Sequence, residues 1–388
     1  MGRLEAIKAK NLSIDATRGK PNMEQVALCQ DMLAPLDNFK AEDGTDVRNY
    51  GGSEGIPEMK RVFGEMLDLT PGEIIVGSNS SLHMMFDTIS TLILTGAWDR
   101  SRIKFLCPSP GYDRHFAICE YFGIKMITVP MTPDGPDMDM VEELAKDPDV
   151  AGMWCVPVFS NPQGYIYSDD IIRRLAAIPT ANPTFRILWD NAYTVHNFTG
   201  TRPMPVNILR ECEKNGHGNR PVIFTSFSKI SLAGGGVVCM AGSKSGLAPF
   251  RKRIAAQTIG PDKVNQLRHA RYFKNLAGVE AHMEKHAKIL APKFQLVLDT
   301  FGRELAGTEA TFTSPRGGYF VSVETPPGTA KAIRQLCKDA GVLLTDAGAT
   351  FPYGVDPNDT NIRFAPTFLS MEELEQALEV FCLAVKSV

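Results

Sequence analysis

At 388 residues the chain is longer than one hydrophobic core usually supports, so we expect two domains. Its 44% hydrophobic and 22% charged residues are typical of a globular protein, and a formal net charge of −3 excludes bulk attraction to nucleic acid or to an anionic membrane. Because no apolar run is long enough to span a bilayer, the amino terminus has no apolar secretion core and the eight cysteines are scattered, we expect a cytoplasmic protein with reduced, buried thiols and no metal site.

The amino-terminal two thirds of the chain predict alternating strands and helices. Residues 1 to about 45 read as a helix, a short strand at 12–15 and a loop, TRGKPN. From Tyr50 onward we expect helices at 57–67 and 81–94 and strands at 74–76, 103–107, 125–129, 152–156, 185–189, 222–225 and 237–241. Near-continuous apolar strands of this kind predict an α/β fold, with a mostly parallel sheet covered by helices on both faces.

The pattern changes beyond Pro261. Residues 262–306 show helical periodicity with expected interruptions near Gly278 and Pro292. A strand pair around 311–323, a helix at 330–340, strands at 342–345 and 361–364, and a helix at 371–386 follow. This order predicts a smaller α+β domain completed by the amino-terminal segment, which divides the chain into residues 1–45, 46–289 and 290–388.

In an open parallel sheet, ligands bind at the carboxyl ends of the strands, so the residues that follow each apolar run are the candidate site. Ser80 and Ser81 follow the strand at 74–76 and begin a helix, where free N–H groups and hydroxyls favour a phosphate, although a plain N-cap would use the same residues. After the strand at 103–107, in PSPGYDRH, Tyr112 could stack on a heteroaromatic ring and Arg114 could point into the same cavity; an ordinary surface turn is the alternative.

Three later strand ends add polar groups. Asn161 precedes a proline, which holds it extended as a placed donor. Asp190 ends a strand so apolar that its carboxylate must be paired, either with a turn that it caps or with a pyridine nitrogen, and Tyr193 lies three residues on. Lys229, in TSFSKISLAGGG, follows a buried strand and is a candidate Schiff-base nucleophile, although a Ser-rich exposed turn reads the same in isolation.

Taken together, these strand ends resemble those of the fold-type I pyridoxal-phosphate aminotransferases, and specifically a divergent aspartate aminotransferase subgroup. The segments that carry the resemblance are TRGKP, RNYGG with GIPE, KFLCPSPGYDRHFAI, GPDMD, WCVPVFSNPQG, WDNAYTVH, SFSKI, IGPDKVNQLRHAR, GGYF and NIRFAPTF. They run from Thr17 to Phe368, nearly the whole chain.

The resemblance implies a role for each site residue. Lys229 would hold pyridoxal 5'-phosphate as a Schiff base and move the substrate's proton, Asp190 would pair with the pyridine nitrogen, Asn161 and Tyr193 would contact the ring oxygen, and Tyr112 would stack on the ring. The cofactor phosphate would be bound by Ser80, Ser81, Ser226 and, from the neighbouring subunit of a homodimer, Tyr50. Arg363 would take the substrate α-carboxylate, with Gly19 and Asn161 beside it, and Arg114 would read a distal carboxylate; Arg18, Lys20 and Lys263 are weaker candidates for that role.

The resemblance implies amino transfer from aspartate to 2-oxoglutarate by a ping-pong mechanism. One departure from the family pattern is that the stretch eight residues after Lys229 is glycine-rich and lacks the usual phosphate-binding arginine. The alternatives are an aromatic, kynurenine-like or aminoadipate donor, an elimination, decarboxylation or condensation on the same cofactor, and a cofactor-binding module without turnover. Two further patterns are interpreted as having no functional role. His282 and His286 are read as a solvated helix face, and the basic run 263–271 is too short to predict nucleic-acid binding.

Overall fold

The computed structural model describes residues 3–388, whose largest sheet has eight strands. Their order is β2-β9-β8-β7-β6-β3-β4-β5. Their bounds are β2 Ile74–Val76, β3 Lys104–Ser109, β4 Lys125–Thr132, β5 Gly135–Pro136, β6 Val150–Cys155, β7 Arg186–Asp190, β8 Pro221–Ser226 and β9 Val238–Ala241. The neighbours from β4 through β3, β6 and β7 to β8 pair in parallel, whereas β8–β9, β9–β2 and β4–β5 are antiparallel. The expected mostly parallel sheet is confirmed.

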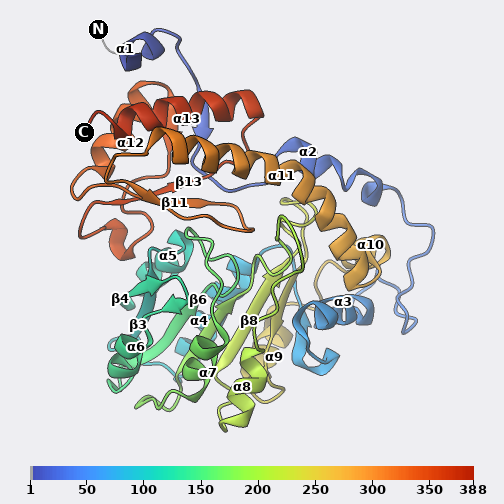
Figure 1. The fold of residues 1–388 in the computed structure, drawn as a ribbon. Helices are drawn as coiled ribbons and strands as arrows, with labels where there is room; N and C mark the ends of the chain where they lie inside the picture. Colours follow the sequence, from blue (N-terminus) through green and yellow to red (C-terminus); the bar gives the residue numbers. More distant parts are fainter. Residues whose placement is uncertain (1–2) are drawn as a thin grey trace.

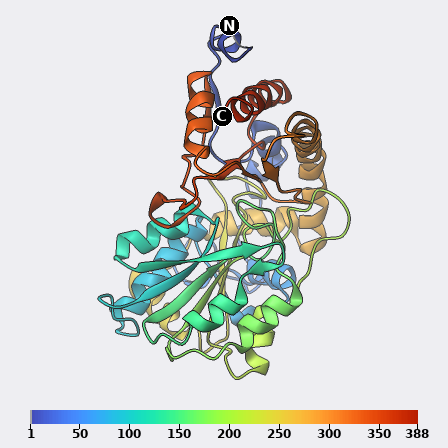
Figure 2. The ribbon, with the colours of Figure 1, turned by 60° about the vertical axis from the view of Figure 1, so that its left-hand side comes forward.

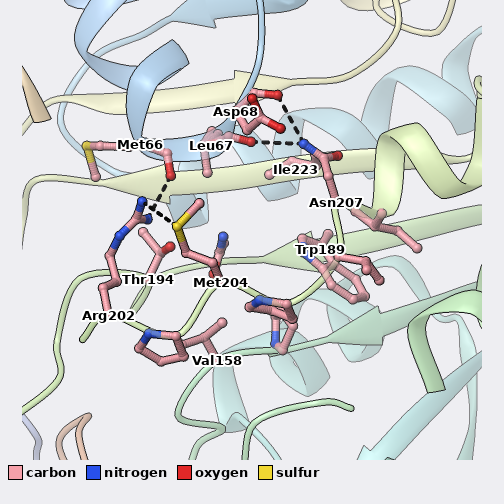
Figure 3. Close-up of a pocket in the computed structure, with 16 residues that line it drawn as sticks. Met66, Leu67, Asp68, Val158, Trp189, Thr194, Arg202, Met204, Asn207 and Ile223 are labelled. Atoms are coloured by element: carbon pink, nitrogen blue, oxygen red, sulfur yellow. Dashed lines mark hydrogen bonds between the residues drawn. The ribbon is translucent and has the colours of Figure 1, made fainter. Parts of the chain in front are cut away.

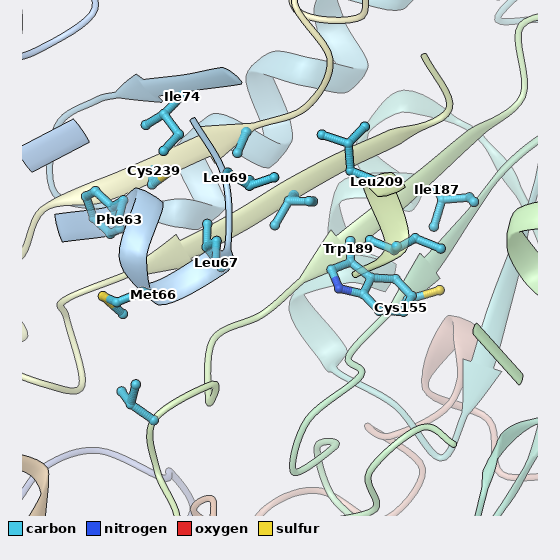
Figure 4. Packing of buried hydrophobic residues seen from close by; sticks show 14 of the residues in the cluster. Phe63, Met66, Leu67, Leu69, Ile74, Cys155, Ile187, Trp189, Leu209 and Cys239 are labelled. Carbon is cyan, nitrogen blue, oxygen red and sulfur yellow. The ribbon is translucent and has the colours of Figure 1, made fainter. Parts of the chain in front are cut away.

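Helices cover both faces of this sheet, because successive strand residues point to opposite sides. In β7, Ile187 and Trp189 belong to a core formed with α3, α6, α7, α8 and α10 (Figure 4), whereas Leu188 belongs to a core formed with α4, α5 and α9. The helix bounds are α3 Pro57–Leu67, α4 Ser81–Leu94, α5 Asp113–Phe122, α6 Met138–Leu144, α7 Asp169–Ala177, α8 Ile208–Lys214, α9 Ala248–Gln257 and α10 Lys263–Phe273. Burial on both faces explains why the central strands read as continuous apolar runs.

A smaller unit lies at one end of the large sheet (Figures 1 and 2). Its strands β10 Thr311–Phe312, β11 Val321–Glu324 and β13 Asn361–Phe364 form an antiparallel sheet, and its helices are α11 Leu276–Glu304, α12 Ala330–Asp339 and α13 Met371–Val385. The amino-terminal segment carries α1 Arg3–Lys8, β1 Ile14–Ala16 and α2 Met23–Ala27, and β1 pairs in parallel with β12 Val342–Leu344. Short 3-10 turns occur at η1 Gln30–Leu33, η2 Pro71–Glu73 and η3 Pro352–Gly354. No helix within residues 3–388 combines the length and the apolar character needed to cross a membrane.

The helix α11 differs from its prediction, because it runs unbroken through both Gly278 and Pro292. A side chain at position 278 would have its Cβ 1.8 Å from the carbonyl oxygen of Phe273, so the glycine allows a close approach between α10 and α11 instead of ending a helix. The predicted division between residues 289 and 290 falls inside α11 and stays a prediction.

Candidate active site

A cavity of about 560 Å³ opens between the large sheet and the smaller unit. Seven of the predicted site residues line it: Gly19, Tyr112, Arg114, Asn161, Tyr193, Lys229 and Arg363. Four of these lie just beyond β3, β6, β7 and β8, because parallel strands bring their carboxyl ends to one edge of the sheet. The smaller unit and the amino-terminal loop supply the opposite wall through Arg363 and Gly19.

Lys229 lies in the turn that follows β8. The turn is closed by a hydrogen bond from Phe227 N to Val237 O at 2.8 Å, and Ser228 Oγ donates to Asn79 O at 3.0 Å. The second bond joins the turn to the serine-rich loop after β2. The Lys229 ammonium lies 4.9 Å from the centroid of the Tyr193 ring, so the amine of the predicted catalytic lysine is next to an aromatic face.

Asp190, at the end of β7, has only one of its two carboxylate oxygens satisfied. His115 Nε2 donates to Oδ2 at 3.0 Å, and the His115 ring stacks on Trp154 with centroids 4.2 Å apart and planes inclined by 4°. Oδ1 is buried and has no hydrogen-bond partner among the described residues. A buried carboxylate oxygen without a partner is costly, so Asp190 is built to accept one more hydrogen bond.

Two tyrosines stand beside this carboxylate. Tyr112, the N-cap residue of α5, feels the charges of Lys229 and Asp190, and burial raises its pKa to about 12. Tyr193 is 3% exposed, and burial together with the negative charge of Asp190 raises its pKa above its ordinary value. Both phenols are therefore protonated donors at neutral pH.

Arg363 reaches the cavity from β13. Its Nη1 donates to Asp113 Oδ1 at 2.9 Å and to Asn161 Oδ1 at 3.2 Å, and its guanidinium carbon lies 4.9 Å from the centroid of the Phe320 ring. Arg114 is less constrained: its side chain is 45% exposed, and its nearest carboxylate oxygen, on Asp113, is 3.9 Å away.

The three serines predicted to hold a phosphate lie near the lysine turn but do not line the same cavity. Ser80 is the N-cap of α4, where its Oγ accepts from His83 N at 3.4 Å, and Ser81 is the first residue of that helix. Ser226 is buried at the end of β8, and its Oγ accepts from Ser228 N at 3.3 Å. Of the three glycines that follow, only Gly236 is tightly packed, since a Cβ there would lie 2.7 Å from Ser228 Oγ.

Of the remaining predicted residues, some line the cavity and others lie outside it. Tyr50 is 81% exposed and lies outside the cavity, whereas Arg18 lines it. The Lys20 ammonium lies 3.8 Å over the Phe368 ring, and Lys263 is buried beside Gly52. Neither Lys20 nor Lys263 lines the cavity.

Sequence reasoning missed two polar neighbours of the site, His115 and Asp113, although both lie in the segment PSPGYDRH. The interpretation of His282 and His286 as a solvated helix face is wrong, because they are 3% and 1% exposed. The segment α2 packs against α11 from a part of the chain far away in sequence (Figure 1), and its Gln25 is hydrogen-bonded to His286, so the local pattern gave no sign of this burial.

A second cavity, of about 260 Å³, shares none of the predicted site residues (Figure 3). The arginine that lines this cavity, Arg202, already has partners within the protein: Nη1 donates to Met66 O at 3.0 Å, and Nε lies 3.2 Å from Glu280 Oε1. Within residues 3–388 no three His, Cys, Asp or Glu side chains are grouped as a metal site requires. The cavity around Lys229 is therefore the candidate active site.

The family model described as aspartate amino-transferase matches residues 1–388. An aspartate aminotransferase of Corynebacterium glutamicum is 46% identical over 387 residues, covering 97% of this chain and 90% of that protein. The crystal structure of an aspartate transaminase from the same species superposes with a TM-score of 0.95 at 46% identity, covering 99% of this chain and 93% of that one. The α-aminoadipate aminotransferase of Thermus thermophilus, solved with N-(5'-phosphopyridoxyl)-L-leucine, shares the fold at 21% identity, with a TM-score of 0.79 and coverage of 100% of this chain and 95% of that one. The chain therefore belongs to the aspartate aminotransferase family of fold-type I pyridoxal-phosphate enzymes.

Proposed function

We propose that the chain binds pyridoxal 5'-phosphate and transfers the amino group of aspartate to 2-oxoglutarate. The observation that carries this proposal is the buried Oδ1 of Asp190, which has no partner among the described residues and lies near Tyr112 and Tyr193, two residues that line the cavity with Lys229. A protonated pyridine nitrogen is a donor of the kind that this oxygen lacks. When bound, the cofactor supplies an electron sink for the charge that develops at the substrate's Cα.

The proposed roles follow from the donors and acceptors that each residue presents. Lys229 would hold the cofactor through its amine, and its Nζ would carry the proton that leaves the substrate. Asp190 would keep the ring nitrogen protonated, and His115 holds this carboxylate through Oδ2. Tyr193 and Asn161 would contact the ring oxygen, and Tyr112 would lie against the ring. The phosphate is assigned to the backbone and hydroxyls of Ser80, Ser81 and Ser226.

Substrate binding is assigned to the other wall of the cavity. Arg363 offers a guanidinium fork for the α-carboxylate, and Gly19 lies close enough to the Phe320 ring that a Cβ there would be 2.5 Å from it. Arg114 is our candidate for the distal carboxylate, since it lines the cavity and its nearest anionic atom is 3.9 Å away. A cation that binds the charged side chain of the substrate discriminates strongly against apolar amino acids, because an apolar substrate leaves that cation unpaired.

Tyr50 serves the site of a second copy in this proposal, so the functional unit is a homodimer. The proposal is supported by the exposure of Tyr50, which is 81% in the single chain. Mixing a Lys229→Ala chain with a Tyr50→Phe chain tests it, because a hybrid dimer regains one intact site. Failure of the mixture to exceed the sum of the two separate activities, after exchange of subunits has been verified, would remove Tyr50 from this role.

The assignment of activity is tested by borohydride reduction of the cofactor-loaded protein followed by peptide mapping. We expect the reduced adduct on Lys229 and, in parallel, a change of the visible spectrum when aspartate is added. Lys229→Ala is the matched control and should give neither signal. An adduct on another lysine overturns the proposed site, while a spectral response to aromatic amino acids or aminoadipate, and none to aspartate, overturns the proposed substrate.

A further inference from the structure

The main chain at Lys229 is held by hydrogen bonds from side chains that do not line the cavity. The carbonyl oxygen of Lys229 accepts hydrogen bonds from the Tyr319 hydroxyl at 3.3 Å and from His196 Nε2 at 3.4 Å. The next carbonyl, that of Ile230, accepts from His282 Nε2 at 2.9 Å. None of these three donors is among the residues predicted to bind cofactor or substrate.

One side chain, Gln25 of α2, joins two of these supports. Its amide nitrogen donates to the Tyr319 hydroxyl at 3.1 Å and to His286 Nδ1 at 2.9 Å, and its amide oxygen accepts from Asn22 N at 3.1 Å. His286 Nε2 in turn lies 3.1 Å from His282 Nε2. Gln25 is 0% exposed, so both of its N–H groups and its carbonyl oxygen are satisfied inside the protein.

The direction of these bonds is set by Gln25. Because its amide can only donate through nitrogen, His286 Nδ1 must be the acceptor, which puts the ring proton on Nε2, beside the Ile230 carbonyl. His282 Nε2 also carries its proton, since it donates to Ile230 O, so the 3.1 Å approach of the two Nε2 atoms is a packing contact and not a hydrogen bond. In the same way the Tyr319 hydroxyl accepts from Gln25 and is left to donate to Lys229 O. Burial lowers the pKa of His286 to about 3, which keeps this ring neutral and able to accept.

We propose that Gln25 is a positioning residue for Lys229: its amide orients the Tyr319 hydroxyl and the His286 ring packed against His282, and these groups hold the consecutive carbonyls of Lys229 and Ile230. This inference rests on the proposed function, in which Lys229 carries the chemistry. Asn22, the N-cap residue of the same helix, lies three residues beyond Gly19 at the cavity wall, so the amino-terminal segment that lines the cavity is tied to the lysine turn. A tie of this kind matters because catalysis is sensitive to small displacements of a reacting group.

The test compares Gln25→Met, which keeps the length of the side chain but removes the amide, with Glu24→Gln, an exposed control on the same helix. Hydrogen exchange of the peptide covering residues 225–236 gives a readout that needs no turnover. We expect exchange there to accelerate about tenfold in Gln25→Met, and kcat to fall about tenfold with the KM for aspartate nearly unchanged, because the lysine and not the substrate is displaced. The control should behave as the unmodified chain in both measurements.

Tyr319→Phe removes only the hydroxyl and provides the second arm of a double-mutant cycle. Since Gln25 acts partly through Tyr319, the double variant should lose less than the product of the two single losses. Tyr319→Phe alone carries the test if Gln25→Met does not fold, because it should still accelerate exchange at residues 225–236. Two results overturn the inference: multiplicative losses in the cycle, or exchange that accelerates evenly over the whole chain in step with a lower Tm.

Borohydride labelling of the unmodified chain separates this inference from the proposed function. A label on Lys229, together with Gln25 and Tyr319 variants that match the Glu24→Gln control, overturns the positioning role alone. Absence of the label from Lys229 overturns the proposed function instead.

Discussion

Replacing Arg363 by lysine keeps the positive charge in the cavity but removes the guanidinium fork. The structure shows this fork in use, with Nη1 bonded to Asp113 and Asn161 and Nη2 lying 3.4 Å from Thr345 Oγ1. A single ammonium cannot offer a carboxylate two parallel N–H groups. Loss of one charge-assisted hydrogen bond, with an acceptor left unpaired, costs about 2–3 kcal/mol, or about 30- to 150-fold in kcat/KM.

Most of that loss should appear in KM, because the α-carboxylate carries the same charge in the ground state and in the transition state, so the guanidinium binds both about equally. The assay is the steady-state transfer from aspartate by the cofactor-loaded Arg363→Lys protein, with Arg303→Lys, on the exposed face of α11, as a matched control. Thermal unfolding should show both variants folded. A kcat/KM for aspartate within about threefold of the unmodified protein would refute the assignment of the α-carboxylate to Arg363.

Three further predictions follow from the contacts of the site. His115→Phe keeps an aromatic ring in place but leaves Asp190 Oδ2 without its donor. We expect kcat to fall about tenfold while the apparent affinity for aspartate stays nearly constant. An unchanged kcat would show that this hydrogen bond does not contribute to catalysis. Arg114→Leu should raise the KM for aspartate at least about tenfold more than the KM for an aromatic donor, and equal effects on both would remove Arg114 from substrate reading. Burial lowers the pKa values of His196 and His286 to about 3, below the ordinary 6.5. Between these two values the unfolded chain binds more protons than the folded chain. For each histidine, the free energy of unfolding should therefore fall by about 1.4 kcal/mol per pH unit as the pH falls below 6.5. Urea unfolding between pH 7 and 5 measures this slope, which His196→Gln should reduce; identical slopes would contradict the buried neutral state.

The strands of the large sheet were predictable because burial on both faces leaves no choice of residue along them. Ile187, Leu188 and Trp189 point alternately into two cores, so each position must be apolar and the run stands out in the sequence. The same rule located the site, since a polar residue directly after such a run must lie at the sheet edge. Asn161 and Lys229 were found in this way, and both line the cavity.

The helical region was harder to predict because local signals there are ambiguous. Gly278 reads as a break, yet it lies within the first turn of α11, where its missing side chain lets the helix approach the carbonyl oxygen of Phe273. His282 and His286 sit among charged residues and read as solvated, yet both are buried, and Gln25 contacts His286 from a position 261 residues away. Periodicity reports which face of a helix is apolar, and a buried face made of hydrogen-bonded polar groups escapes it.

The supporting partners of the site escaped sequence reasoning for a related reason. His115 reaches Asp190 across 75 residues, and Asp113 reaches Arg363 across 250. A catalytic lysine must lie where a ligand can reach it, which in this fold is the end of a strand. A residue that supports a site residue need only place one hydrogen-bond donor or acceptor at one point in space. Any element that passes that point can supply it, so the chemistry that fixes Lys229, Asp190 and Arg363 in the sequence does not fix the position of their supports. The hydrogen bonds from Gln25 to Tyr319 and from Tyr319 to Lys229 O are of this kind, since Gln25 lies 294 residues away from Tyr319.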